Sequence, residues 1–271
     1  MTNTTNPVEN NYASFMAETL SSAVNREIYK QGAKEGQGYS LQLSGHDLSK
    51  VPPEVIASPT RPKLINLAPV QPSITGFYGP AALALVLQHM AVTLIALSIV
   101  RERASGAMDR FRSSPMRATE IVLGKVLAFG LLGAGIAALS VWLLVSILGV
   151  PFLGSPLAIA VVLALLLVAS LGLGLLISVV SDSERQAVQL SLLLLLASVF
   201  FSGFVIQIEE FNTAVRLGAY ILPVTHGIQL LQDFMLDGTT AHAWQLLALA
   251  GIAAAVLVGS WVMLWREMRP S

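Results

Sequence analysis

Beyond residue 78 the chain consists mainly of long uncharged apolar runs separated by short polar segments. At a rise of 1.5 Å per residue, about 20 apolar residues cross a hydrocarbon core of roughly 30 Å. Five runs reach this length, and they cover residues 79–100, 122–149, 157–180, 187–206 and 244–265. The pattern therefore predicts five membrane-spanning segments.

Any one of these runs could be a buried helix of a soluble core, but a domain of this size cannot bury five of them in succession. The runs lack the alternation of barrel strands, and a helix satisfies all its backbone hydrogen bonds within one segment. Composition agrees, because 54% of the residues are apolar and only 12% are charged. We therefore predict an all-α polytopic membrane domain over residues 79–271.

Residues 1–78 mix charged, amide and proline residues as a separate module does. Within residues 9–30, apolar side chains recur at every fourth position, namely at Tyr12, Met16, Leu20, Val24 and Ile28. This spacing predicts an amphipathic helix whose apolar face needs a partner. Tyr39, Leu41 and Leu43 alternate with polar residues, as a short strand would. The prediction is a small α+β module, which either contacts substrate or packs on the membrane domain.

Basic residues in short loops predict the orientation of the spans. Between the first two runs lie Arg101, Arg103, Arg110, Arg112 and Arg117, and Lys125 lies at the start of the second. Residues 151–156 carry no charge, whereas Arg266 and Arg269 follow the last run. The predicted location is the plasma (inner) membrane, with segment 101–121 and the C-terminus in the cytoplasm. The module of residues 1–78 and the segment 207–243 then lie outside.

The start of the chain, Met1-Thr-Asn-Thr-Thr-Asn-Pro7, has neither the basic nor the apolar region of a signal peptide. A module of 78 residues must nevertheless reach the outer face in the predicted orientation. We therefore expect that an upstream first span is missing from this chain.

Charge and cysteine content exclude several classes of function. The formal net charge is zero and cysteine is absent. Charge thus gives no argument for a nucleic-acid partner, and disulfides and thiolate chemistry are excluded. The sequence lacks a phosphate loop and the His-Glu-x-x-His and Gly-x-Ser-x-Gly patterns. We expect no enzymatic activity and no cofactor in this chain, so energy for any transport must come from elsewhere.

The predicted cytoplasmic loop carries a distinctive motif. It reads Arg-Glu-Arg-Ala-Ser-Gly-Ala-Met-Asp over residues 101–109, followed by Ser114-Pro115 and Gly124-Lys125. On composition alone, the loop could be no more than a positively charged anchor. The motif nevertheless resembles that of ABC-2 type permeases, which carry Arg-Glu-Arg-Glu-x-Gly-Thr-x-Glu, then Thr-Pro and Gly-Lys. Ala104 and Ala107 depart from the usual acid and threonine.

Further matches to the same family follow in the expected order. They are Gln186-Ala187-x-Gln189, Phe201-Ser202-Gly203-Phe204, Leu222-Pro223-Val224-Thr225-His226 and Leu236-Asp237-Gly238. The resemblance covers about residues 60–269. It is greatest to multidrug-type exporters, in which an outer domain lies between the first two spans.

The resemblance implies two permease subunits, identical or different, and two ABC ATPase subunits that bind ATP and magnesium. It assigns coupling to the ATPase to Arg101, Glu102, Arg103, Gly106, Asp109, Arg110 and Pro115. Because the spans carry almost no charge, the expected cargo is a small hydrophobic or amphiphilic compound. The alternatives are a membrane anchor or assembly protein without transport, an exporter of glycan or lipid-linked cargo, and an intramembrane enzyme.

The segment 207–238 is predicted to be a re-entrant or interfacial element at the outer face, or else an ordinary loop. Residues 207–219 mix apolar and charged positions as an interfacial helix does. The expected outer gate consists of Gly203, Ile208, Phe211 and Pro223. His226 and Asp233 are either hydrogen-bonded structural residues or part of a proton relay.

Overall fold

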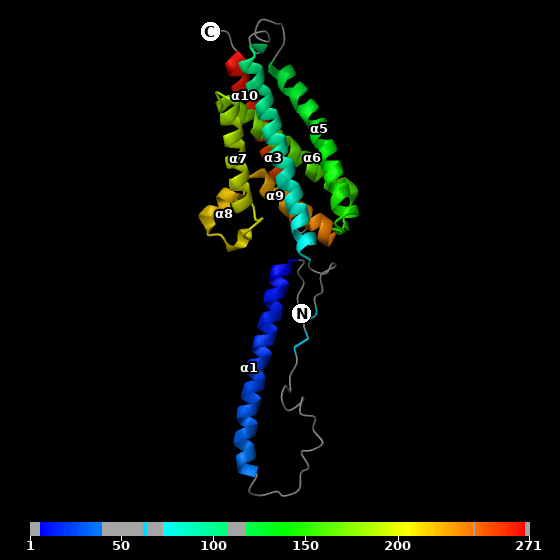
Figure 1. Cartoon of the computed structure of the whole chain (residues 1–271), viewed down its shortest axis with the longest axis vertical. Helices are drawn as coiled ribbons and strands as arrows, with labels where there is room; N and C mark the ends of the chain where they lie inside the picture. The colour runs from blue at the N-terminus through cyan, green and yellow to red at the C-terminus, as the bar shows by residue number, and fades with distance from the viewer. Residues whose placement is uncertain are drawn as a thin grey trace. The chain divides into compact units, whose positions relative to one another are not determined.

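The computed structural model describes residues 6–39, 62–63, 65, 73–107, 118–240 and 242–268 (Figure 1). The chain forms two compact units, residues 1–73 and residues 74–271. Each unit is described by itself.

The described part of the first unit contains helix α1 (Pro7–Tyr39). The Asn6 side-chain oxygen accepts a hydrogen bond from the Val8 amide at 2.9 Å, and Pro7 occupies the first helical position, so the sequence starts the helix with two standard signals. The predicted helix over residues 9–30 is confirmed and is longer at its C-terminal end. Its apolar residues, such as Tyr12 and Leu20, are exposed within this unit.

The α+β prediction for this module is not supported, because no strand occurs among the residues that the structure describes. Tyr39, the first residue of the predicted strand, is the last residue of α1. Leu41 and Leu43 lie outside the described residues. An alternation of three residues is a weak signal, whereas extending an existing helix adds one hydrogen bond for each residue that it orders.

The second unit contains the five predicted spans as helices. They are α3 (Ile74–Ala104), α5 (Ala118–Ser146), α6 (Pro156–Val180), α7 (Glu184–Phe201) and α10 (Ala243–Met268). All five are long and apolar enough to cross a membrane, which confirms the prediction. Several helices begin or end beyond the predicted runs because polar residues continue a helix past the hydrocarbon core, whereas α5 and α7 end three and five residues before their runs do.

Helices α3 and α6 form the centre of this unit (Figure 1). They make the most extensive helix pair, α7 and α5 pack on α3, and α10 packs on α6. Gly174 of α6 sets the central crossing, because a Cβ there would lie 2.5 Å from the Val92 carbonyl oxygen of α3. Small residues permit such close approach where no hydrophobic effect drives helices together.

The segment between α7 and α10 folds into short helical elements. It contains a 3₁₀ turn η2 (Ile208–Glu210), α8 (Thr213–Ala219), α9 (Pro223–Gln232) and a π-helical turn η3 (Asp233–Asp237). Asn212 caps α8 by accepting a hydrogen bond from the Val215 amide at 3.0 Å. The helix predicted over residues 207–219 is thus present only in its second half.

Candidate functional site

Five charged residues join the helix ends at the end of the second unit where α3 leads toward α5. We name Arg101, Glu102, Arg103, Lys125 and Glu184 the charged clamp. The Arg101 Nε donates to the Glu184 Oε2 at 2.9 Å, which ties the end of α3 to the start of α7. Both side chains are well exposed, so this pair by itself contributes little stability.

The pair between Glu102 and Lys125 is more enclosed. The Lys125 Nζ donates to the Glu102 Oε1 at 2.7 Å and to the Ser98 Oγ at 2.7 Å, which ties α5 to α3. The side chains of Lys125 and Glu102 are 11% and 30% exposed, so solvent and salt screen this pair less than the first. Lys125 is the lysine of the Gly-Lys motif.

Arg103 holds the end of a third helix. Its Nη1 donates to the carbonyl oxygens of Ser178 at 3.2 Å and of Ser181 at 2.9 Å. These carbonyls lie at the C-terminal end of α6, where the helix leaves its last acceptors without internal partners and carries a partial negative charge. The guanidinium therefore caps α6 both by hydrogen bonding and by charge.

Three consecutive residues can reach three different helices because each step around a helix turns by about 100°. Arg101, Glu102 and Arg103 thus point toward α7, α5 and α6. Gly106 ends α3 with a φ of 71°, a left-handed conformation that suits glycine at a helix C-terminus. The first half of the motif is in this way a junction of helix ends, and the loop begins directly after it.

The structure brings some of the predicted coupling residues together and leaves others aside. Arg101, Glu102, Arg103 and Gly106 gather at the charged clamp, with partners inside the chain. Asp109, Arg110 and Pro115 lie outside the described residues. Contact of any of these residues with an ATPase stays a prediction. Sequence reasoning missed Glu184, although an acidic residue in the first turn of a span was an available signal.

Reversing one charge of the enclosed pair should destabilise the membrane domain. We expect Glu102→Lys to lower the free energy of unfolding by about 2 kcal/mol, because it places two cations together in a half-buried site. The double variant Glu102→Lys with Lys125→Glu should recover at least half of the loss. Unfolding in mixed micelles by increasing SDS measures both values. Equal loss in the single and double variants would contradict the pairing.

At the opposite end of the unit, Gly203 and Ile208 lie against each other. Ile208 is only 2% exposed. Gly203 has a φ of 90°, and a Cβ on it would lie 3.1 Å from the Ile208 side chain, so both its backbone and its neighbour require glycine. The ring centroids of Phe201 and Phe211 lie 6.2 Å apart. Both residues are close to Gly203 and Ile208 in the sequence.

Pro223 serves as the first residue of α9 and is buried. The Ile208 side chain is buried within the chain and lies against Gly203, the glycine of the Phe-Ser-Gly-Phe motif. The roles of Gly203, Ile208, Phe211 and Pro223 as an outer gate stay a prediction. What the described residues show is a stable turn that ends α7 and starts the segment before α10.

His226 is placed as a structural residue. Its Nε2 donates to the Tyr220 carbonyl oxygen at 2.9 Å, and its ring stacks on Tyr220 and meets the edge of Trp244. Burial lowers the pKa of the imidazole, and the hydrogen bond to the Tyr220 carbonyl acts in the opposite direction. A neutral ring with a fixed donor fits the structural alternative.

Asp233 joins the π-helical turn to the start of α10. Its Oδ2 accepts from the Thr240 Oγ1 at 2.8 Å and from the His242 Nδ1 at 3.2 Å. Asp237, one turn further on, is close enough for the two carboxylates to repel each other. Burial, and then the charge of Asp233, raise the pKa of Asp237 above its ordinary value.

This raised pKa predicts a pH dependence of stability. The folded chain holds the Asp237 proton more tightly than the unfolded chain, so the stability contributed by this group falls as the pH rises from the ordinary aspartate pKa through the raised one. Asp237→Asn should therefore raise the melting temperature at pH 7.5 and have little effect at pH 4. The exposed Asp182→Asn should change neither value. A lower melting temperature for Asp237→Asn at pH 7.5 would refute the prediction.

A polar pair that the sequence did not reveal lies inside the spans. The Gln88 Nε2 of α3 donates to the Ser198 Oγ of α7 at 2.9 Å, and the Gln88 side chain is among the most buried at 2% exposed. A hydrogen bond of this kind between spans joins helices in the absence of water. Single amide and hydroxyl residues within long apolar runs gave no periodic signal from which their pairing could be predicted.

The fold and the charged clamp together define a multi-pass membrane protein with five apolar helices, four of which are joined at their ends beside one loop. The model of the ABC-2 family transporter proteins matches residues 2–265. The chain therefore belongs to the ABC-2 transporter family.

Named relatives agree with this assignment. The chain is 32% identical over 182 residues to the probable multidrug ABC transporter permease YbhS of Escherichia coli, and the match covers 67% of this chain and 48% of the relative. It is 29% identical over 182 residues to the inner membrane transport permease YhhJ of E. coli, covering 66% and 49%. It is 30% identical over 168 residues to the ABC transporter G family member 20 of Dictyostelium discoideum, covering 61% and 23%. The chain thus spans about half the length of the bacterial relatives.

Proposed function

We propose that this chain is the permease subunit of an ATP-driven exporter in the plasma membrane. A separate ABC ATPase binds ATP and magnesium, and two permease chains form the pathway. Family membership and the relatives named as multidrug permeases support this proposal. The cargo is a small hydrophobic or amphiphilic compound.

The charged clamp is the observation that carries the proposal. It ties the ends of α3, α5, α6 and α7 to one another immediately before the loop that an ATPase would grip. Such a junction lets a push on the loop move several spans as a rigid body, which is how domain motions are transmitted. A simple membrane anchor has no need for a junction of this kind.

The proposed cargo follows from the interior of the spans. Between residues 74 and 100 and between 126 and 181 the sequence contains no Asp, Glu, Lys or Arg. Moving an ion or a strongly charged solute through hydrocarbon requires charged or coordinating groups along the path. An apolar or amphiphilic compound does not, and it can enter from the bilayer.

The orientation of the loop is tested by labelling. Since the chain has no cysteine, Arg110→Cys introduces a single thiol without background. In the proposed orientation, a membrane-impermeant maleimide labels it only after the cells are permeabilised. Glu209→Cys, an exposed position in the outer segment, should be labelled in intact cells. Labelling of Arg110→Cys from outside would invert the orientation and remove the basis of the proposal.

Transport itself is tested with the permease co-expressed with a candidate ABC ATPase. ATP hydrolysis by the purified complex should exceed that of the ATPase alone, and inside-out vesicles should accumulate a hydrophobic dye in the presence of ATP. A complex that forms without stimulated hydrolysis or dye movement would instead identify the chain as an anchor or assembly protein.

A further inference from the structure

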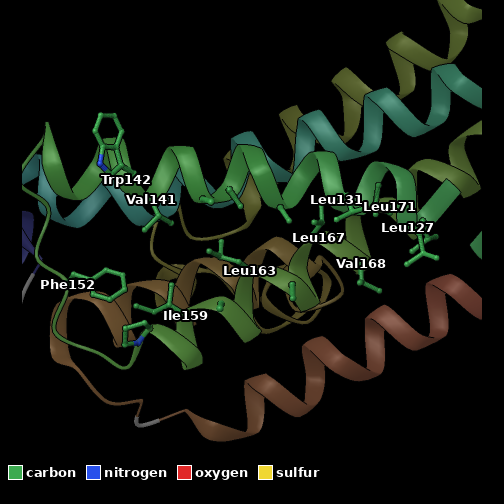
Figure 2. Close-up of a pocket in the computed structure, with 18 residues that line it drawn as sticks. Leu127, Leu131, Val141, Trp142, Phe152, Ile159, Leu163, Leu167, Val168 and Leu171 are labelled. Carbon is green, nitrogen blue, oxygen red and sulfur yellow. The ribbon is translucent and has the colours of Figure 1, made fainter. Parts of the chain in front are cut away.

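An apolar groove of about 730 Å³ runs along the contact between α5 and α6 (Figure 2). Its volume lies within the range of small-molecule sites, which is about 300–1,000 Å³. All 18 residues that line it are apolar, and the indole nitrogen of Trp142 is the only polar side-chain atom among them. Its lining begins at Val126, the residue after Lys125 of the charged clamp, and extends along α5 away from the clamp.

Small residues create the groove. A Cβ on Gly133 of α5 would meet the Leu167 side chain of α6 at 2.5 Å, so the two helices lie close together at this point. Beside this contact, alanines face the open side of the groove, at positions Ala134, Ala138, Ala160 and Ala164. Larger side chains at these four positions would fill the space.

The groove is elongated. Its α5 lining extends from Val126 to Trp142, which corresponds to about 24 Å of helix. An extended hydrocarbon chain can lie along this length with its carbons at van der Waals distance, about 4 Å, from the lining side chains.

The two ends of the groove differ. Leu127 and Leu171 lie at one end, and Trp142 and Phe152 lie at the other (Figure 2). Trp142 is four residues from the end of α5, at the level where tryptophans of membrane proteins meet the lipid headgroups. Its exposed ring can present the N–H group to an oxygen acceptor while the rest of the site stays apolar.

We propose that this groove is a binding site for one acyl chain of a membrane phospholipid. Both walls are helices long and apolar enough to cross a membrane, so lipid chains can reach the open side. The buried side chains of Ile159, Leu163 and Leu167 form a wall against which the chain packs. The Trp142 N–H then donates to an ester or phosphate oxygen at the chain's headgroup end, a contact that a pure hydrocarbon would not provide.

The site is tested by photocross-linking the full chain in nanodiscs of phosphatidylcholine that carries a diazirine near the end of one acyl chain. We expect the cross-links of the wild type to concentrate on residues that line the groove. Ala138→Phe and Ala164→Phe should abolish these cross-links by filling the groove. Ala128→Phe, an exposed position on α5 outside the lining, should leave them unchanged. Cross-links spread evenly over all lipid-facing helices, or equal in all variants, would overturn the proposal.

Three further measurements keep the test decisive. Trp142→Phe keeps the ring but removes the donor, so it should reduce the cross-link yield without filling the groove. With the single cysteine of Ala138→Cys, efficient cross-linking to a second polypeptide would show that a protein covers the groove and would overturn the proposal. Loss of the lipid cross-links when ATP is added to the complex with its ATPase would identify the occupant as cargo, and would overturn the assignment to a resident lipid.

Discussion

Gly174→Leu should prevent the membrane domain from folding. A Cβ at this position would meet the Ile95 side chain and would lie 2.5 Å from the Val92 carbonyl oxygen and 3.0 Å from the Val92 Cα, all in α3. The backbone of α3 cannot move aside without separating α3 from α6, the most extensive helix pair of the unit. We expect a loss of more than about 3 kcal/mol, which exceeds the usual cost of overpacking because backbone atoms are involved.

The matched control is Gly251→Leu in α10, where a Cβ has no neighbour within 4 Å. This change adds the same side chain on an exposed face of a span and removes a glycine from a helix, so expression and melting temperature should be unchanged or higher. Gel-filtration profiles of fluorescent fusions compare the two variants in one experiment. A monodisperse, wild-type-like Gly174→Leu protein would show that α3 and α6 are not packed as described.

Arg103→Ala should be the most damaging single change within the charged clamp. It removes two charge-assisted hydrogen bonds to the end of α6 and leaves the Ser178 and Ser181 carbonyls without this donor. Hydrogen bonds to charged groups contribute about 1.5–3 kcal/mol each. Because both bonds are only partly buried, solvent weakens them, and we expect a combined loss of about 2–4 kcal/mol in the free energy of unfolding. Arg103→Lys should recover only part of this, because an ammonium group lacks the planar fork of a guanidinium.

Arg101→Ala is the comparison for this experiment, since its partner Glu184 is exposed and the pair should contribute less than about 1 kcal/mol. SDS unfolding and ATP hydrolysis by the complex should be measured on the same preparations. If Arg103→Ala unfolds like the wild type but no longer stimulates hydrolysis, Arg103 acts on the partner protein and its role as a cap of α6 is refuted.

The five spans could be predicted because the bilayer imposes a minimum length on any apolar run, a constraint that one sequence is enough to reveal. The segment between α7 and α10 follows no such rule. Pro223 at the first position of α9 was visible, but the buried residues that follow it, such as Val224 and Leu230, are covered by α3, α6 and α10 and not by lipid. Their burial depends on which helices pack against α9. A single sequence does not show this as a periodic pattern of apolar residues.

The motif around Arg101 illustrates the same limit for the candidate site. Its residue types and their place beside a span predict a functional region, and Gly106 ends α3 as glycines commonly do. The partners of Arg101 and Arg103 are nevertheless 83 and 78 residues away in the chain. The spacing of residues within the motif carries no information on partners so far away in the sequence. The motif therefore predicts contacts with an external partner, whereas the contacts that the structure describes lie within the chain.

The buried pair between Gln88 and Ser198 has a consequence for how α7 can slide along α3. Ser202 lies one turn beyond Ser198 and is fully buried, and neither its hydroxyl nor the Gln88 carbonyl oxygen has a hydrogen-bond partner among the described residues. A displacement of α7 by four residues, about 6 Å, would bring Ser202 to the height that Ser198 now occupies. The Gln88 amide would then exchange the Ser198 hydroxyl for the Ser202 hydroxyl, so the buried amide would keep a hydrogen-bond partner in both registers.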